Sequence, residues 1–210
     1  TARYTVPAHA SLFTGSYPSE VGVHAKSESL NNSGQVLAER LADSGYQTRG
    51  ISANLLASPI NQFDRGFEEF HYSGSAKVLS DSVFQWIEKS QESDRTGIMK
   101  DLYLVKECIF SKYNFIDSAK FGWKIKNNSF HSIDDTIDIV GDISFDEREF
   151  LFINLMDAHA PYSPPKEYRS VTYDERPIED RISNTNQDNL SEQRQAYQDS
   201  VQFLSDRYKL

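Results

Sequence analysis

Apolar side chains recur at helical spacing in several segments of the chain, which predicts a helix in each of them. These segments are 34–44, 80–92, 131–143 and 190–210. Ser33 is placed to cap the first segment, and Gly45 is placed to end it, because glycine adopts the left-handed conformation that closes many helices.

Two other segments have the pattern of β-strands. Residues 150–156 form a nearly continuous apolar run, which is typical of a strand buried on both faces of a parallel sheet. Residues 47–53 read as a shorter strand, and residues 54–70 read as a loop with a turn at Arg65-Gly66-Phe67. A helix, a glycine and a strand in succession form half of a βαβ unit, so we expect an α/β fold.

The opening of the chain has the signals of a short helix. Pro7 suits a first turn, where its missing amide proton costs nothing, and Gly15 suits the end. Thr5 is then expected just before the helix, where free amide groups and the positive end of the dipole point. A hydroxyl there suits an anionic centre, although a threonine that only caps its helix is the commoner situation.

Polar residues follow the long apolar run at Asp157-Ala158-His159. Ligands in α/β folds bind at the carboxyl ends of buried strands, so this position favours a binding or catalytic role. His159 could donate a proton to an oxyanion or ligate a metal, or it could simply be hydrogen-bonded within a loop.

Composition narrows the possible functions. The chain has 22 basic and 31 acidic residues and a net charge of −9, which argues against a general nucleic-acid binder. The single cysteine, Cys108, excludes an internal disulfide and a cysteine-based zinc site. No stretch approaches the roughly 20 apolar residues of a membrane span.

Residues 98–130 differ from the rest, with six lysines, three acidic residues and seven aromatic residues. This composition predicts a helical or irregular insert. It is either a lid or packing element with solvated lysines, or a surface that faces an anion or a lipid.

Two of these segments together resemble the sulfatases of the alkaline phosphatase superfamily. Residues 5–15, TVPAHASLFTG, are similar to the family's nucleophile segment, which reads Cys or Ser, x, Pro, x, Arg and then a helix ending in Thr-Gly. Residues 156–165, MDAHAPYSPP, resemble its Asp-Pro-His-x-Pro-Tyr strand end, and residues 65–70 resemble a turn of sulfatase-like members. The resemblance spans nearly the whole chain.

The resemblance implies a three-layer α/β/α sandwich that is incomplete, as a fragment of the N-terminal catalytic domain. Residues 1–75 would hold the nucleophile helix and an αβ unit. Residues 76–147 would be a helical insert, and residues 148–210 would hold a core strand, a loop and a helix. We expect residues 1–210 alone to be inactive.

The resemblance also implies roles for individual residues. Thr5 lies at the nucleophile position and would be one metal ligand, and His9 takes the place of the motif arginine. His159 corresponds to the histidine that binds the non-bridging oxygens of the ester, and Asp157 would lie beside it in the substrate site. Asn54 lies where the family has a lysine and a histidine, so it is also expected to bind substrate.

The family uses a divalent metal, most simply Ca2+, with Mn2+, Mg2+ or Zn2+ in some relatives. By the resemblance, its other ligands would precede Thr1 or follow Leu210. The expected substrate is a sulfated or phosphorylated small molecule, glycan or lipid headgroup.

Threonine at position 5 departs from the family pattern. Sulfatases oxidise the nucleophile residue to an aldehyde, but oxidation of a threonine would give a ketone, so no formylglycine is expected at Thr5. A threonine hydroxyl suits a phospho-threonine intermediate. The predicted function is therefore a sulfatase-like, metal-dependent hydrolase of sulfate or phosphate esters. The alternatives are a phosphotransferase or phosphodiesterase that works through phospho-threonine, and a catalytically degenerate binding module.

Overall fold

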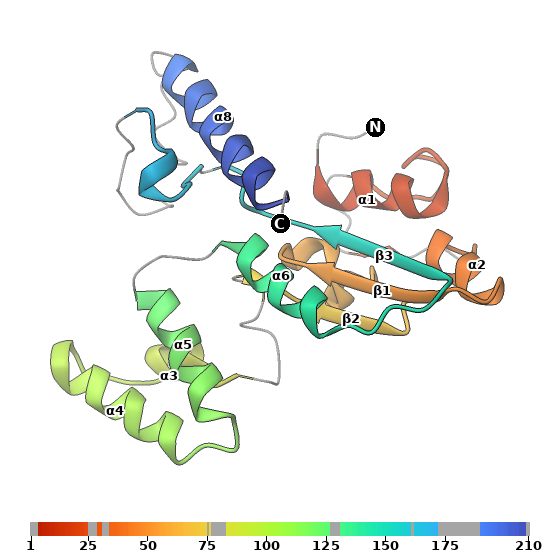
Figure 1. The fold of residues 1–210 in the computed structure, drawn as a ribbon. Helices are drawn as coiled ribbons and strands as arrows, with labels where there is room; N and C mark the ends of the chain where they lie inside the picture. The colour runs from red at the N-terminus through yellow and green to blue at the C-terminus, as the bar shows by residue number, and fades with distance from the viewer. Residues whose placement is uncertain are drawn as a thin grey trace. The chain divides into compact units, whose positions relative to one another are not determined.

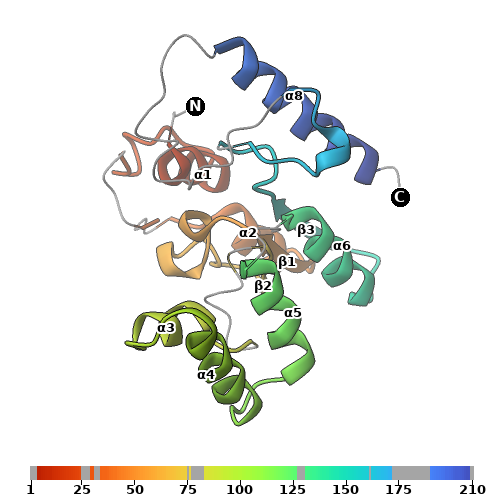
Figure 2. The same cartoon turned by 90° about the vertical axis from the view of Figure 1, so that its left-hand side faces the viewer.

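The computed structural model describes residues 4–24, 29–30, 34–74, 76, 83–126, 131–160, 162–171 and 190–208. Figures 1 and 2 show the helices and strands of these residues, which fall into two compact units. The first unit comprises Thr1–Phe130 and Ser144–Asn154, and the second comprises His131–Ile143 and Leu155–Leu210.

The first unit contains a small sheet together with helices. Its elements are α1 (Thr5–Thr14), α2 (Leu37–Asp43), β1 (Gln47–Ser52), the 3-10 turns η1 (Leu55–Ala57) and η2 (Pro59–Asn61), β2 (Glu69–Tyr72), α3 (Trp86–Gln91), α4 (Gly97–Ile109), α5 (Phe115–Lys126) and β3 (Glu149–Asn154). The second unit contains α6 (Ser132–Asp142), the 3-10 turn η4 (Lys166–Tyr168) and α8 (Leu190–Arg207).

The three strands form a parallel sheet in the order β2-β1-β3 (Figure 1). Gly50 on the central strand pairs with Phe70 on one side and with Phe152 on the other. The predicted α/β class is confirmed, as are the strands at 47–53 and 150–156 to within two residues. The expectation of a loop as far as residue 70 is wrong at its end, because Glu69 begins the edge strand β2.

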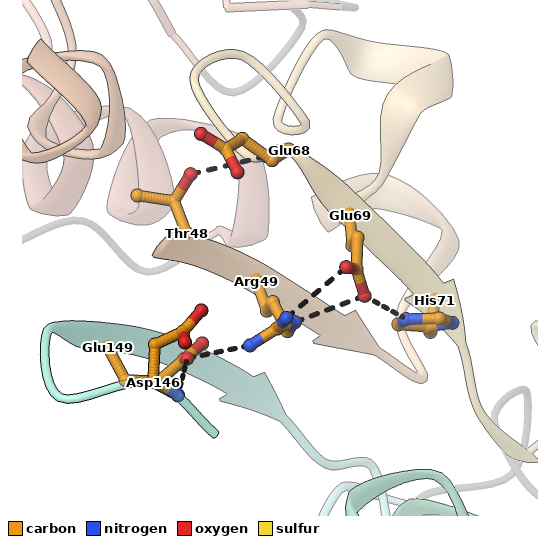
Figure 3. Close-up of polar contacts among 7 residues, drawn as sticks. All are labelled: Thr48, Arg49, Glu68, Glu69, His71, Asp146 and Glu149. Atoms are coloured by element: carbon orange, nitrogen blue, oxygen red, sulfur yellow. Dashed lines mark hydrogen bonds and ion pairs between the residues drawn. The ribbon is translucent and has the colours of Figure 1, made fainter. Parts of the chain in front are cut away.

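An arginine on the central strand ties both neighbouring strands to it (Figure 3). The buried Arg49 guanidinium donates to Glu149 on β3 at 2.6 Å and to Glu69 on β2 at 3.1 Å. The hydrogen bond from Arg49 is the main reason that the pKa of Glu69 lies below its ordinary value. A buried charge is costly unless it is paired, and here the two glutamates pair with Arg49 from the neighbouring strands.

The helix α1 covers one face of the sheet. Its Phe13 ring meets Phe152 of β3 at a centroid distance of 5.0 Å, and the surrounding core includes Phe63. Gly15 ends the helix at φ 70°, as predicted, and Pro7 lies in the first turn. One detail is corrected: Thr5 is the first residue of the helix rather than the residue before it, and Tyr4 is the N-cap.

Two other helices begin later than their patterns predict. The helix α2 begins at Leu37, because the Glu39 carboxylate accepts from the Val36 amide at 2.9 Å and closes the first turn there. The predicted cap at Ser33 lies outside the described residues. The helix α3 begins at Trp86.

The insert is helical in α4 and α5, with an exposed apolar stripe along α4. Leu104 and Cys108 of α4 are buried, while four residues at helical spacing are exposed: Ile98, Leu102, Val105 and Ile109. None of the helices in the described part of the chain is both long and apolar enough to cross a membrane.

The Arg65-Gly66-Phe67 turn packs tightly against α2. Arg65 donates to the Glu39 carboxylate at 3.0 Å, and the Gly66 carbonyl accepts from Thr48 Oγ1 at 2.7 Å. Gly66 has a φ of +78°, and a Cβ added to it would lie 2.2 Å from the backbone nitrogen of Glu39. Only glycine fits this position without displacing α2.

We therefore expect Gly66→Ala to lower the free energy of unfolding by roughly 2–4 kcal/mol, as the sum of left-handed strain and overpacking. The matched control is Gly22→Ala, which has the same strain at φ +69° but no atom within 4 Å of the added Cβ, and which should cost about 1 kcal/mol. Chemical denaturation of the two variants measures the difference. Equal losses would show that the contact with α2 does not constrain the turn.

Candidate active site

The first turn of α1 presents a hydroxyl and the backbone amides of Thr5 and Val6, since Pro7 has no amide proton and the Ala8 amide donates to the Tyr4 carbonyl at 3.0 Å. It consists of Thr5, Val6, Pro7 and Ala8, so no acidic side chain in it opposes the positive end of the helix dipole. Within the described part of the chain, the Thr5 hydroxyl has no hydrogen-bond partner. The turn is therefore electrostatically suited to an anion and leaves one side-chain oxygen available.

His9 is bonded at both of its ring nitrogens. Its Nδ1 lies 2.8 Å from the Thr5 carbonyl oxygen, and its Nε2 lies 3.2 Å from the Asn154 side-chain nitrogen. A carbonyl only accepts, so Nδ1 carries the proton, and Nε2 then accepts from the Asn154 amide. His9 thus links the first turn of α1 to the last residue of β3.

This arrangement keeps the His9 ring neutral. Burial lowers the pKa of His9 below its ordinary value of 6.5, partly offset by the hydrogen bond to the Thr5 carbonyl. The ring also meets Phe63 and Phe152 edge-on, at centroid distances of 5.8 and 6.2 Å. The imidazole therefore does not supply the fixed positive charge that an arginine would bring to this position.

Asn154 and Asn54 both lie at the carboxyl edge of the sheet, where the Asn154 carbonyl accepts from the Ala53 amide at 2.9 Å. The Asn54 side-chain oxygen accepts from the Leu56 amide at 2.9 Å and caps the turn η1. Sequence reasoning selected Asn54 and missed Asn154. The only sequence signal for Asn154 was its place at the end of the apolar run.

In the second unit, the Asp157 carboxylate is directed at the N-terminus of α6. Its Oδ2 accepts from the Ile133 amide at 3.1 Å and from the Ser132 hydroxyl, and its side chain is only 1% exposed. His131 Nδ1 lies 3.6 Å from the other carboxylate oxygen. These contacts give Asp157 a structural role, and its predicted contact with substrate stays a prediction.

His159 lies in the turn that follows Asp157, and its side chain is exposed. Its backbone amide donates to the Met156 carbonyl at 3.0 Å, and its ring Nδ1 lies 2.6 Å from the Ala160 carbonyl oxygen. Nδ1 therefore carries a proton, which leaves Nε2 to meet a ligand. Thr5, His9 and Asn54 belong to the first unit, and Asp157 and His159 belong to the second.

The described residues do not by themselves form a metal site. No three histidine, cysteine, aspartate or glutamate side chains among them are grouped so that they could hold an ion. Both nitrogens of His9 are hydrogen-bonded, and the Thr5 hydroxyl is one oxygen at this position that could contribute to an ion.

Comparison with models of known protein families shows the family to which the chain belongs. The model of the sulfatase family matches residues 1–206, which is nearly the whole chain. The chain belongs to the sulfatase family. No curated protein and no solved structure matches it.

Membership confirms the resemblance inferred from the two motifs. It places this sulfatase-family chain among ester hydrolases as a class, and its small parallel sheet and helices fit the family's α/β/α fold, in incomplete form. The roles of Thr5, His9, Asn54, Asp157 and His159 stay predictions.

Because burial lowers the pKa of His9, the folded state resists protonation of this ring more than the unfolded state does. The stabilisation is thus fully present above the unfolded pKa of about 6.5 and is lost as the pH falls below it. We expect the melting temperature to fall between about pH 7 and about pH 5.5, and the fall to be smaller in His9→Gln. Thermal melts across this range test the expectation, with His159→Gln as the control at an exposed histidine. Identical pH profiles for the protein and for His9→Gln would contradict the assignment.

Proposed function

We propose that the protein hydrolyses sulfate or phosphate esters and that Thr5 is the nucleophile. The observation that carries the proposal is the Thr5 hydroxyl in the first turn of α1, at the carboxyl edge of a parallel sheet and without a partner in the described part of the chain. Ligands of α/β folds bind at this edge, and the free amides of a helix N-terminus stabilise anions.

In the proposed reaction, the Thr5 oxygen forms a bond to the phosphorus or sulfur atom while the bond from that atom to the ester oxygen breaks. The Thr5 hydroxyl proton passes to water, and the leaving alcohol takes a proton from water. Water then hydrolyses the covalent intermediate and regenerates Thr5. The helix N-terminus stabilises the charge on the non-bridging oxygens throughout.

Two histidines support this step in different ways. His9 holds the Thr5 carbonyl at 2.8 Å and so orients the backbone that carries the nucleophile. His159, with an exposed ring whose Nδ1 already donates to the Ala160 carbonyl, would donate from Nε2 to a non-bridging oxygen of the ester when both ring nitrogens carry protons. Asn54 and Asp157 are the remaining proposed contacts of the substrate.

The divalent cation implied by the family, most simply Ca2+, would lower the pKa of the attacking hydroxyl and offset the charge of the ester. Thr5 would be one of its ligands, and the described residues contain no group of three His, Cys, Asp or Glu side chains that could hold the ion. The proposed substrate is a sulfated or phosphorylated small molecule, glycan or lipid headgroup.

A catalytically degenerate binding module is the second candidate. The neutral His9, in the place of a motif arginine, favours it, because the site then lacks one fixed positive charge beside the nucleophile position. Such a module would bind an anionic ester without turning it over.

We expect Thr5→Ala in the full-length protein to lower kcat for phosphate or sulfate monoesters by roughly 10^3-fold or more, because the attacking oxygen is removed. Thr5→Ser keeps that oxygen and should retain most of the activity. The matched control is Thr14→Ala on the same helix, where the Thr14 hydroxyl donates to the Ala10 carbonyl at 2.7 Å and accepts from the Ser16 amide at 3.3 Å, at the opposite end from Thr5. Steady-state assays with added Ca2+, Mn2+, Mg2+ or Zn2+ make the comparison, and unchanged turnover in Thr5→Ala would exclude Thr5 as the nucleophile.

A trapped intermediate identifies the chemistry at position 5. Trypsin releases residues 4–26 as one peptide, because Arg3 and Lys26 flank a stretch without lysine or arginine. After an acid quench during turnover of a phosphate ester, we expect fragment-ion mass spectrometry to find phosphate on Thr5 and none on Thr14. An oxidised residue at position 5 would contradict the argument against carbonyl formation, and binding of the ester without turnover or modification would favour the binding module.

A further inference from the structure

One serine of α6 contacts the turn that carries His159 on both its backbone and its acidic side chain. Ser132 is 4% exposed, and its hydroxyl donates to Asp157 Oδ2 and accepts from the Met156 amide at 3.0 Å. A serine hydroxyl has one proton to donate and lone pairs to accept with, so both bonds exist together.

The turn from Met156 to His159 is fixed at each end by these bonds. The Met156 amide is held by Ser132, and the Met156 carbonyl accepts from the His159 amide at 3.0 Å. Between them, Asp157 is held by Ser132 and by the Ile133 amide. The described contacts therefore fix the backbone on which His159 stands, while its ring stays exposed.

The same contacts complete the N-terminus of α6. The N-cap residue His131 makes no side-chain capping bond, and the Asp157 carboxylate takes its place from 24 residues along the chain at Ile133. Helix formation and the geometry of the turn are thus coupled, because neither Ser132 nor Asp157 can keep its partners if the other moves.

We propose that Ser132 is a positioning residue for His159, acting through Met156 and Asp157. The proposal rests on the role of His159 in the proposed function. It gives Asp157 a supporting role in this turn, in addition to the substrate contact proposed for it above.

A double-mutant cycle in the full-length protein tests the proposal. We expect Ser132→Ala to lower kcat/KM for a phosphate or sulfate monoester roughly tenfold, because displacement of a catalytic group by a fraction of an ångström has effects of this size. In a His159→Ala background the same change should cost less than about twofold, since there is no ring left to position. Ser132→Thr, which keeps the hydroxyl, should restore the loss.

The matched control is Thr136→Val, which removes another buried hydroxyl from α6. Among the described residues the Thr136 hydroxyl has no hydrogen-bond partner, so this variant should leave the activity of each background unchanged. Hydrogen exchange supplies a readout that does not depend on turnover. The amides of Met156 and His159 should exchange faster in Ser132→Ala than in the unmodified protein, and their exchange rates should be unchanged in Thr136→Val.

Each result has a separate meaning. Equal losses in the two backgrounds, or no loss in Ser132→Ala while His159→Ala is impaired, would overturn the positioning role and leave the proposed function intact. Full activity in His159→Ala would overturn the role of His159 in the proposed function, and the positioning role with it.

Discussion

The two hydrogen bonds of the His9 ring form the constraint on which the candidate site depends. They join the Thr5 carbonyl, in the first turn of α1, to the Asn154 side chain at the end of β3. Apolar packing also holds α1 in place, because Val6 in its first turn, Ala10 and Phe13 all belong to the buried core. The His9 ring adds a directional contact between that first turn and the end of β3. The link fixes where the Thr5 hydroxyl lies, at the cost of keeping the His9 ring neutral.

The sheet supplies the other half of this geometry. The three strands pair in parallel, so their carboxyl ends lie together, and Arg49 on the central strand pairs with carboxylates on both neighbours. The turn at Gly66 then brings α2 against the sheet through Thr48 and Glu39. Ion pairs and one close backbone contact thus supplement the apolar core in a sheet with three described strands.

Local sequence signals predicted the elements well where a pattern extends over several residues. Proline and glycine marked both ends of α1, and the apolar run marked β3. The strand β2 was missed because its four residues are at the edge of the sheet and lack a buried pattern. Asn154 and Ser132 were missed for another reason: their partners are 145 and 25 residues away in the chain, and no local pattern reports such a contact.

The N-termini of α1 and α6 differ in the number of acidic side chains near the positive end of the helix dipole. The first turn of α6 contains Asp134 and Asp135 and also receives the carboxylate of Asp157, so its dipole is already opposed by negative charge. The first turn of α1 has no acidic residue and begins at Thr5, which carries a hydroxyl. The N-terminus of α1 is therefore electrostatically more favourable to an anion than that of α6, where three carboxylates lie and one of them, Asp134, is paired with Arg207. In the proposed function, the first motif would offer the attacking oxygen at a helix N-terminus without carboxylates, and the second would hold His159 in place.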